Sequence, residues 1–153
     1  MTKQEVLDGA LALNGEEKNY IIKVEGDKII IEVKYKDAIV FSPLSPREDL
    51  SIFRSIACLN DDKTFVEIHK HIDSSKGIFK FMKSVSYGHK VEKSISFGYN
   101  KNTGKTGAVV VNFNSKDYTK IVREYLESCG YKRTRRGFFK RLFKKKASKE
   151  EQL

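Results

Sequence analysis

Residues 20–35 read YIIKVEGDKIIIEVKY, and this stretch decides the fold class. Apolar and polar side chains alternate on both sides of Gly26-Asp27, with the period of two residues that a strand with one buried face requires. Adjacent glycine and aspartate favour a tight turn between antiparallel strands. The stretch therefore predicts a β-hairpin.

Helical periodicity precedes this hairpin and returns near the end of the chain. Thr2 and Glu5 have the spacing of a capping box, and the apolar positions after them predict a helix from Thr2 to Leu13. A second helix is predicted from Ser115 to Ser128, with Gly130 ending it. Its apolar face is formed by Tyr118, Ile121, Val122, Tyr125 and Leu126.

The segment after the hairpin, 37–50, contains Pro43 and Pro46, so it is predicted to be a loop and not a central strand. The sequence Ser-Pro-Arg-Glu at 45–48 predicts a single helical turn there. Residues 50–59 fit a helix and a strand about equally. The turn residues at 60–63 favour a strand that forms a second hairpin.

Further strands are predicted at about 78–85, 91–99 and 107–113. The chain is thus expected to form one α+β domain, residues 1–130, followed by a basic amphipathic tail, residues 131–153. The sheet is expected to be a mainly antiparallel twisted sheet or open barrel of six to seven strands, with an N-terminal and a C-terminal helix. This order of elements resembles the pleckstrin-homology superfold. The resemblance rests on the count of elements, so it implies a layout and no activity.

The composition favours a single cytoplasmic domain. The 153 residues are enough for one core, and 39% of them are apolar. The N-terminal residues lack the pattern of a signal peptide, so Cys58 and Cys129 are expected to be reduced and buried. No apolar run approaches the length of a membrane-spanning helix, so any membrane attachment is expected to be peripheral.

Motifs for catalysis or cofactor binding are weak throughout the sequence. The stretch from Gly98 to Thr106 has five residues between its glycines and leads into a strand, so we interpret it as a hairpin turn and not a phosphate loop. His69 and His71 share one strand face, but no third metal ligand is marked, and we expect them to be exposed. The turn at Asp61-Asp62 is interpreted as solvated. The sequence therefore favours a non-enzymatic protein, with no catalytic residue, metal or cofactor assigned.

The tail carries the strongest functional signal. Ten of the thirty basic residues lie between Lys132 and Lys149, and without residues 131–153 the net charge of +10 falls to +2. Arranged as a helix, the tail places four apolar side chains along one arc and bases around the rest. The candidate contact residues are Lys132, Arg133, Arg135, Arg136, Phe138, Phe139, Lys140, Arg141, Leu142, Phe143, Lys144, Lys145 and Lys146.

Three functions compete for this tail. The first is reversible attachment of a binding or adaptor domain to an anionic membrane surface. The second is nucleic-acid binding, in which the bases contact phosphates and Phe138 or Phe139 stacks on unpaired bases. In the third, the apolar stripe packs on the domain, which then serves as a β-barrel module for a small molecule or a protein partner. The sequence leaves the oligomeric state undetermined.

Overall fold

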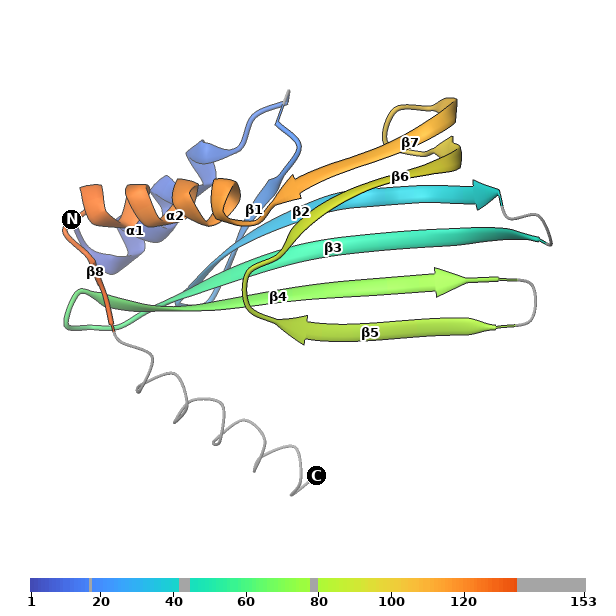
Figure 1. Ribbon diagram of the computed structural model, residues 1–153. Helices are drawn as coiled ribbons and strands as arrows, with labels where there is room; N and C mark the ends of the chain where they lie inside the picture. The colour runs from blue at the N-terminus through green and yellow to red at the C-terminus, as the bar shows by residue number, and fades with distance from the viewer. Residues whose placement is uncertain (17, 42–44, 78–79, 135–153) are drawn as a thin grey trace, which may run out of the picture.

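The computed structural model describes residues 1–16, 18–41, 45–77 and 80–134 (Figure 1). These residues form an α+β domain built on a mostly antiparallel open sheet, which confirms the predicted fold class. Within them, no helix is both long and apolar enough to cross a membrane. In chain order the elements are α1 (Lys3–Ala10), the short 3-10 helix η1 (Leu11–Leu13), β1 (Ile21–Glu25), β2 (Lys28–Phe41), β3 (Pro46–Leu59), β4 (Thr64–Lys76), β5 (Phe81–Tyr87), β6 (Val91–Asn100), β7 (Lys105–Asn114), α2 (Lys116–Ser128) and β8 (Lys132–Arg133).

The sheet has eight strands, where the sequence predicted six to seven. The main path is β5-β4-β3-β2-β6-β7. Strand β2 has two neighbours along one edge, because β1 pairs with residues 28–32 and β6 pairs with residues 38–40. The additional strand β8 has two residues and pairs with β4 in parallel.

Both predicted helices are confirmed. Thr2 caps α1 in a complete capping box with Glu5, and η1 extends the helical segment to Leu13. Helix α2 begins after Ser115 and carries Asp117 in its first turn. Gly130 follows with a positive φ of 87°, a conformation that glycine adopts without steric cost.

The expected loop at 37–50 is the main error of the sequence analysis. Strand β2 continues to Phe41, and β3 begins at Pro46, so the single helical turn predicted at 45–48 is also wrong. Proline fits here because it stands at the first position of β3, where no ladder hydrogen bond from its nitrogen is needed. Residues 50–59 are strand, as the turn after them indicated.

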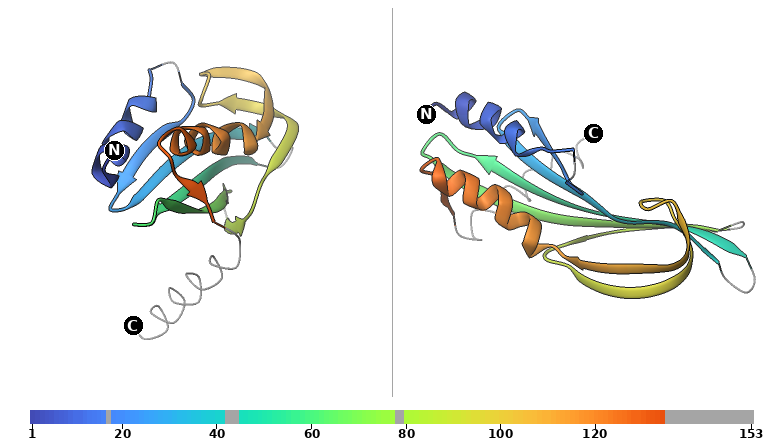
Figure 2. Two further views of the ribbon diagram at one scale, coloured as in Figure 1. Left: turned by 90° about the vertical axis from the view of Figure 1, so that its left-hand side faces the viewer. Right: turned by 90° about the horizontal axis from the view of Figure 1, so that it is seen from above.

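The register divides the side chains of β1 to β7 between two faces. We call the face that carries Ile31, Phe53 and Phe65 the inner face and the opposite one the outer face. Helices α1 and α2 cover one end of the inner face, and the β6–β7 hairpin curls over the same side farther along the sheet (Figure 2). The buried core under the helices includes Val6, Leu7, Ile29, Ile31, Phe65, Val122 and Leu126.

The hairpin approaches the sheet closely at Gly98. This residue pairs with Val40 of β2, and a Cβ atom placed on Gly98 would overlap the backbone carbonyl of Ile39. Glycine therefore allows β6 to lie beside β2 at the point where the hairpin begins to curl.

Candidate functional site

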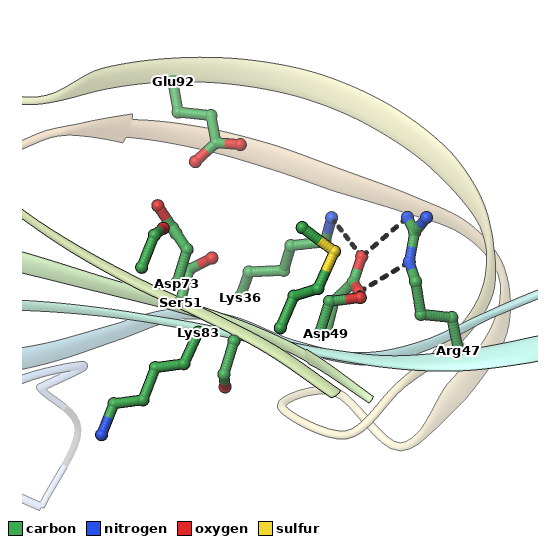
Figure 3. Close-up of a pocket in the computed structure, with 11 residues that line it drawn as sticks. Lys36, Arg47, Asp49, Ser51, Asp73, Lys83 and Glu92 are labelled. Carbon is green, nitrogen blue, oxygen red and sulfur yellow. Dashed lines mark hydrogen bonds and ion pairs between the residues drawn. The ribbon is translucent and has the colours of Figure 1, made fainter. Parts of the chain in front are cut away.

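The curl of the hairpin leaves a polar groove beyond the apolar core, with a volume of about 410 Å³ (Figure 3). Strands β2 to β6 all contribute to its lining. The residues are Lys36, Arg47, Asp49, Ser51, Asp73, Ser74, Ser75, Met82, Lys83, Ser84 and Glu92. Its size lies within the usual range for small-molecule sites.

A buried carboxylate organises one end of the groove. Asp49 accepts hydrogen bonds from Nε and Nη2 of Arg47, at 2.8 and 3.0 Å, and from the Ser75 hydroxyl at 3.0 Å. The Lys36 ammonium lies 3.1 Å from its Oδ2 atom. Burial alone would raise the pKa of Asp49, but the contacts with Arg47, Lys36 and Ser75 lower it overall. Asp49 is therefore ionised and fully paired.

The other end of the groove holds two further carboxylates. Asp73 accepts a hydrogen bond from the Tyr35 hydroxyl at 3.3 Å, and Glu92 lies across the groove from Asp73 and Ser51 (Figure 3). Within the described residues Glu92 makes no hydrogen bond or ion pair. Burial raises the pKa of Tyr35, and the negative charges of Asp73 and Glu92 raise it further. This end of the groove is anionic.

A second polar network runs along β4 beneath α2. Glu67 is paired bidentately with Arg123, at 2.8 and 2.6 Å, and its side chain is only 7% exposed. His69 Nε2 lies 3.2 Å from Glu67, while His69 Nδ1 lies 3.0 Å from the Ser55 hydroxyl. The contacts Ser55–His69–Glu67 thus have the order of a hydrolase nucleophile, base and acid.

The surroundings of this network argue against catalysis. Ser55 is 6% exposed and does not line the groove, so its hydroxyl is poorly accessible to a substrate. Glu67 is also neutralised by Arg123. We interpret the contacts as a buried polar network that fixes α2 to β4.

The histidines are not exposed as the sequence analysis expected. His69 and His71 do share a face, but it is the inner one, and His71 is 8% exposed. The ring of His89 contacts that of His69, with centroids 4.4 Å apart and planes tilted by 33°. In the part of the chain that the structure describes, no group of three or more His, Cys, Asp or Glu side chains is placed to hold a metal ion. The expectation of buried cysteines is also wrong, because Cys58 and Cys129 are half-buried.

The outer face has a different character. Twelve large apolar side chains are exposed in the described residues, and the strand register places nine of them on the outer face. Five of them lie on β6, β7 and the end of β2, and we call these five the outer patch. Its members are Phe41, Val91, Ile95, Phe97 and Val110, which are 44%, 61%, 77%, 61% and 60% exposed.

The charges on the outer face are predominantly basic. In β1 to β7 the outer positions carry eight bases, Lys23, Lys28, Lys34, Arg54, Lys70, Lys76, Lys83 and Lys93. They carry four acids, Glu25, Glu32, Asp37 and Glu48, so the net charge of the outer face is eight minus four, or +4. In β6 and β7 the one charged outer position is Lys93, because Glu92 faces the groove.

The predicted tail lies mostly outside the described residues. Of the candidate contact residues, Lys132 and Arg133 form β8, where Arg133 Nη1 is 3.8 Å from Glu67. Tyr131 is in the core, and the Thr134 amide donates to the Phe65 carbonyl at 2.9 Å. The start of the tail is thus fixed to β4. The candidate contact residues outside the described part of the chain are Arg135, Arg136, Phe138, Phe139, Lys140, Arg141, Leu142, Phe143, Lys144, Lys145 and Lys146.

Sequence reasoning found neither the groove nor the outer patch. Both depend on which strands become neighbours, and residues 42–90 separate β2 from β6 in the chain. The signal available was the alternation in β6, where Glu92, Ser94 and Ser96 alternate with Val91, Ile95 and Phe97. Alternation identifies two faces but does not say which one is buried.

Comparisons with protein-family models, with curated proteins and with solved structures found no match for this chain.

Proposed function

We propose that this protein is a non-enzymatic cytoplasmic binding module that attaches reversibly to anionic membrane surfaces. The observation that carries the proposal is the combination on the outer face of large exposed apolar side chains with a net charge of +4. Contiguous apolar surface with a polar rim is typical of interaction sites, and a basic rim favours an anionic partner.

The outer patch supplies the apolar part of this attachment. Phe41 and Phe97 form an edge-to-face pair with ring centroids 5.7 Å apart, and Ile95 and Val110 are cross-strand partners beside them. Full burial of one such side chain contributes roughly 1.5 to 3 kcal/mol, and each lysine near an anionic leaflet about 1 kcal/mol. These magnitudes support reversible binding.

The tail is the second part of the proposal and rests on sequence alone. Its bases and its four apolar residues form the pattern of an interfacial helix, and β8 fixes its start to the domain. A pleckstrin-homology-like layout also stays part of the proposal, on the count of seven strands before α2.

Co-sedimentation with vesicles tests the proposal. The full-length protein should sediment with vesicles that contain phosphatidylserine and not with pure phosphatidylcholine vesicles, and binding should weaken as salt screens the charges. The double variant Ile95→Ser/Phe97→Ser should lose most of this binding. Leu11→Ser is the matched control, because Leu11 is 46% exposed but lies in η1, outside the outer face. Equal loss in the control, or no binding by the wild type, would refute the proposal.

A second variant separates membrane binding from the nucleic-acid alternative. Replacing Phe138, Phe139, Leu142 and Phe143 by serine should weaken vesicle binding, because it removes the apolar residues of the tail. Binding of duplex DNA or RNA needs only the bases and should persist. Nucleic-acid binding by a wild type that ignores anionic vesicles would favour the alternative. Unfolding of the variant would show that the stripe packs in the domain.

A further inference from the structure

The polar groove has an uneven distribution of charge. At one end, Asp49 is saturated by Arg47, Lys36 and Ser75. At the other end, Asp73 accepts a hydrogen bond from the Tyr35 hydroxyl and lies 3.8 Å from His71 Nδ1, and Glu92 has no partner among the described residues. Two acids, Asp73 and Glu92, face the end between β4 and β6, while Lys36 and Arg47 lie at the Asp49 end.

Of the three groove carboxylates, Glu92 is the one without a hydrogen bond or ion pair in the described residues. It projects from β6 toward Asp73 and Ser51 on the opposite wall (Figure 3), and it is half-buried. Two carboxylates that face the same space favour a cation between them. A half-buried carboxylate without a partner forgoes a charge-assisted hydrogen bond, which a bound donor would supply.

The other groups of the groove indicate what kind of cation fits. Four serines, Ser51, Ser74, Ser75 and Ser84, supply hydrogen-bonding groups, and Met82 supplies an exposed apolar side chain. No set of three or more metal-binding side chains is found in the described residues, so a bare metal ion would lack ligands. An ammonium group has N–H donors for both carboxylates, and its hydrocarbon part can contact the thioether.

We propose that the groove binds a small organic ammonium ion, with the ammonium group held between Asp73 and Glu92 and its hydrocarbon part against Met82. The site is separate from the outer face, since Glu92 points inward from β6 while Ile95 and Phe97 point outward. Ligand binding here does not depend on membrane attachment.

Titration of the full-length protein with butylammonium, followed by NMR of the backbone amides, tests this proposal. Saturable shifts are expected for residues of β4 and β6 that line the groove. Butyrate, which has the same hydrocarbon chain and the opposite charge, should produce no saturable shift. Absence of saturation with butylammonium, or equal binding of butyrate, would overturn the proposal.

Two variants and one control locate the site. Glu92→Gln and Asp73→Asn should each weaken the affinity by at least about tenfold, which is the loss of one charge-assisted contact. Glu48→Gln is the matched control, because Glu48 is an exposed carboxylate on the outer face, and it should leave the affinity unchanged. If Asp73→Asn disturbs the fold, Glu92→Gln alone decides, since Glu92 has no partner to lose in the part of the chain that the structure describes. Unchanged affinity in Glu92→Gln would refute the site.

Discussion

The rings of Tyr35 and Phe113 stack with their centroids 4.1 Å apart and their planes 7° apart. Tyr35 belongs to β2 and Phe113 to β7, and β6 lies between these strands in the sheet. The stacked pair therefore joins two strands that share no ladder, and it holds the curled hairpin against the inner face. The smaller core around this contact also contains Val33, Phe53 and Val111.

Phe113→Ala should lower the free energy of unfolding by about 3 to 5 kcal/mol, because Phe113 is 3% exposed and its removal leaves a cavity. Val110→Ala, at an outer position of the same strand, should change stability by less than about 0.5 kcal/mol. Chemical denaturation of both variants measures the difference. Similar values for the two would show that the hairpin is not held by its inner face.

The ion pair between Arg123 and Glu67 should contribute to stability through burial. Arg123→Met leaves the Glu67 carboxylate buried without its main partner and should cost about 3 kcal/mol. Lys120→Ala breaks an exposed pair with Glu124 on the same helix and should cost less than about 0.5 kcal/mol. Urea denaturation distinguishes the two outcomes. A small cost for Arg123→Met would show that α2 is held to β4 by apolar contacts alone.

The same pair predicts a dependence of stability on pH. Burial alone would raise the pKa of Glu67, but hydrogen bonds from Arg123 and His69 lower it from 4.5 to about 2. A carboxyl with a lowered pKa in the folded state stabilises the fold above pH 4.5 and loses this contribution as the pH falls toward 2. The free energy of unfolding of Glu67→Gln should therefore vary less between pH 4.5 and 2 than that of the wild type. Equal pH dependence would contradict the assignment.

His89 should titrate below the ordinary pKa of histidine. Burial lowers the pKa of His89, and the nearby charges of His69, Lys116 and Arg123 lower it further. Because the folded state resists protonation, this contribution to stability is present above pH 6.5 and declines as the pH falls below it. NMR titration should show the His89 pKa rising toward 6.5 in His69→Gln. An unchanged pKa would mean that the 4.4 Å ring contact is absent in solution.

Local sequence patterns predicted which helices and strands form better than they predicted where the strands end and which strands pair. The capping box at Thr2 and the period of α2 depend on residues close in sequence, and both helices are confirmed. The prediction of a loop at 37–50 was wrong because proline is disfavoured only inside a strand, and Pro46 stands at the first position of β3. The pairing of β2 with β6 requires glycine at position 98, because a Cβ atom there would overlap the backbone of Ile39. This overlap can be recognised only once the two strands are known to be neighbours.

The candidate sites were less predictable for the same reason. The tail was visible in sequence as a run of bases, whereas the groove brings together Lys36, Asp73 and Glu92 from three strands. Alternation could place Glu92 and Ile95 on opposite faces of one strand. Only the curl of the hairpin shows that the apolar face of β6 is the exposed outer one. In most antiparallel sheets with one solvent-exposed face, the apolar face is the buried one.

The central claim is that the outer face contacts an anionic membrane, and the absence of tryptophan from the chain allows a direct measurement. Phe97→Trp places a single tryptophan in the outer patch, and Leu11→Trp places one in η1. On addition of phosphatidylserine vesicles, the emission of the tryptophan at position 97 should shift to shorter wavelength and be quenched by brominated lipid, while that at position 11 should do neither. No shift at position 97, or equal shifts at both positions, would contradict the claim.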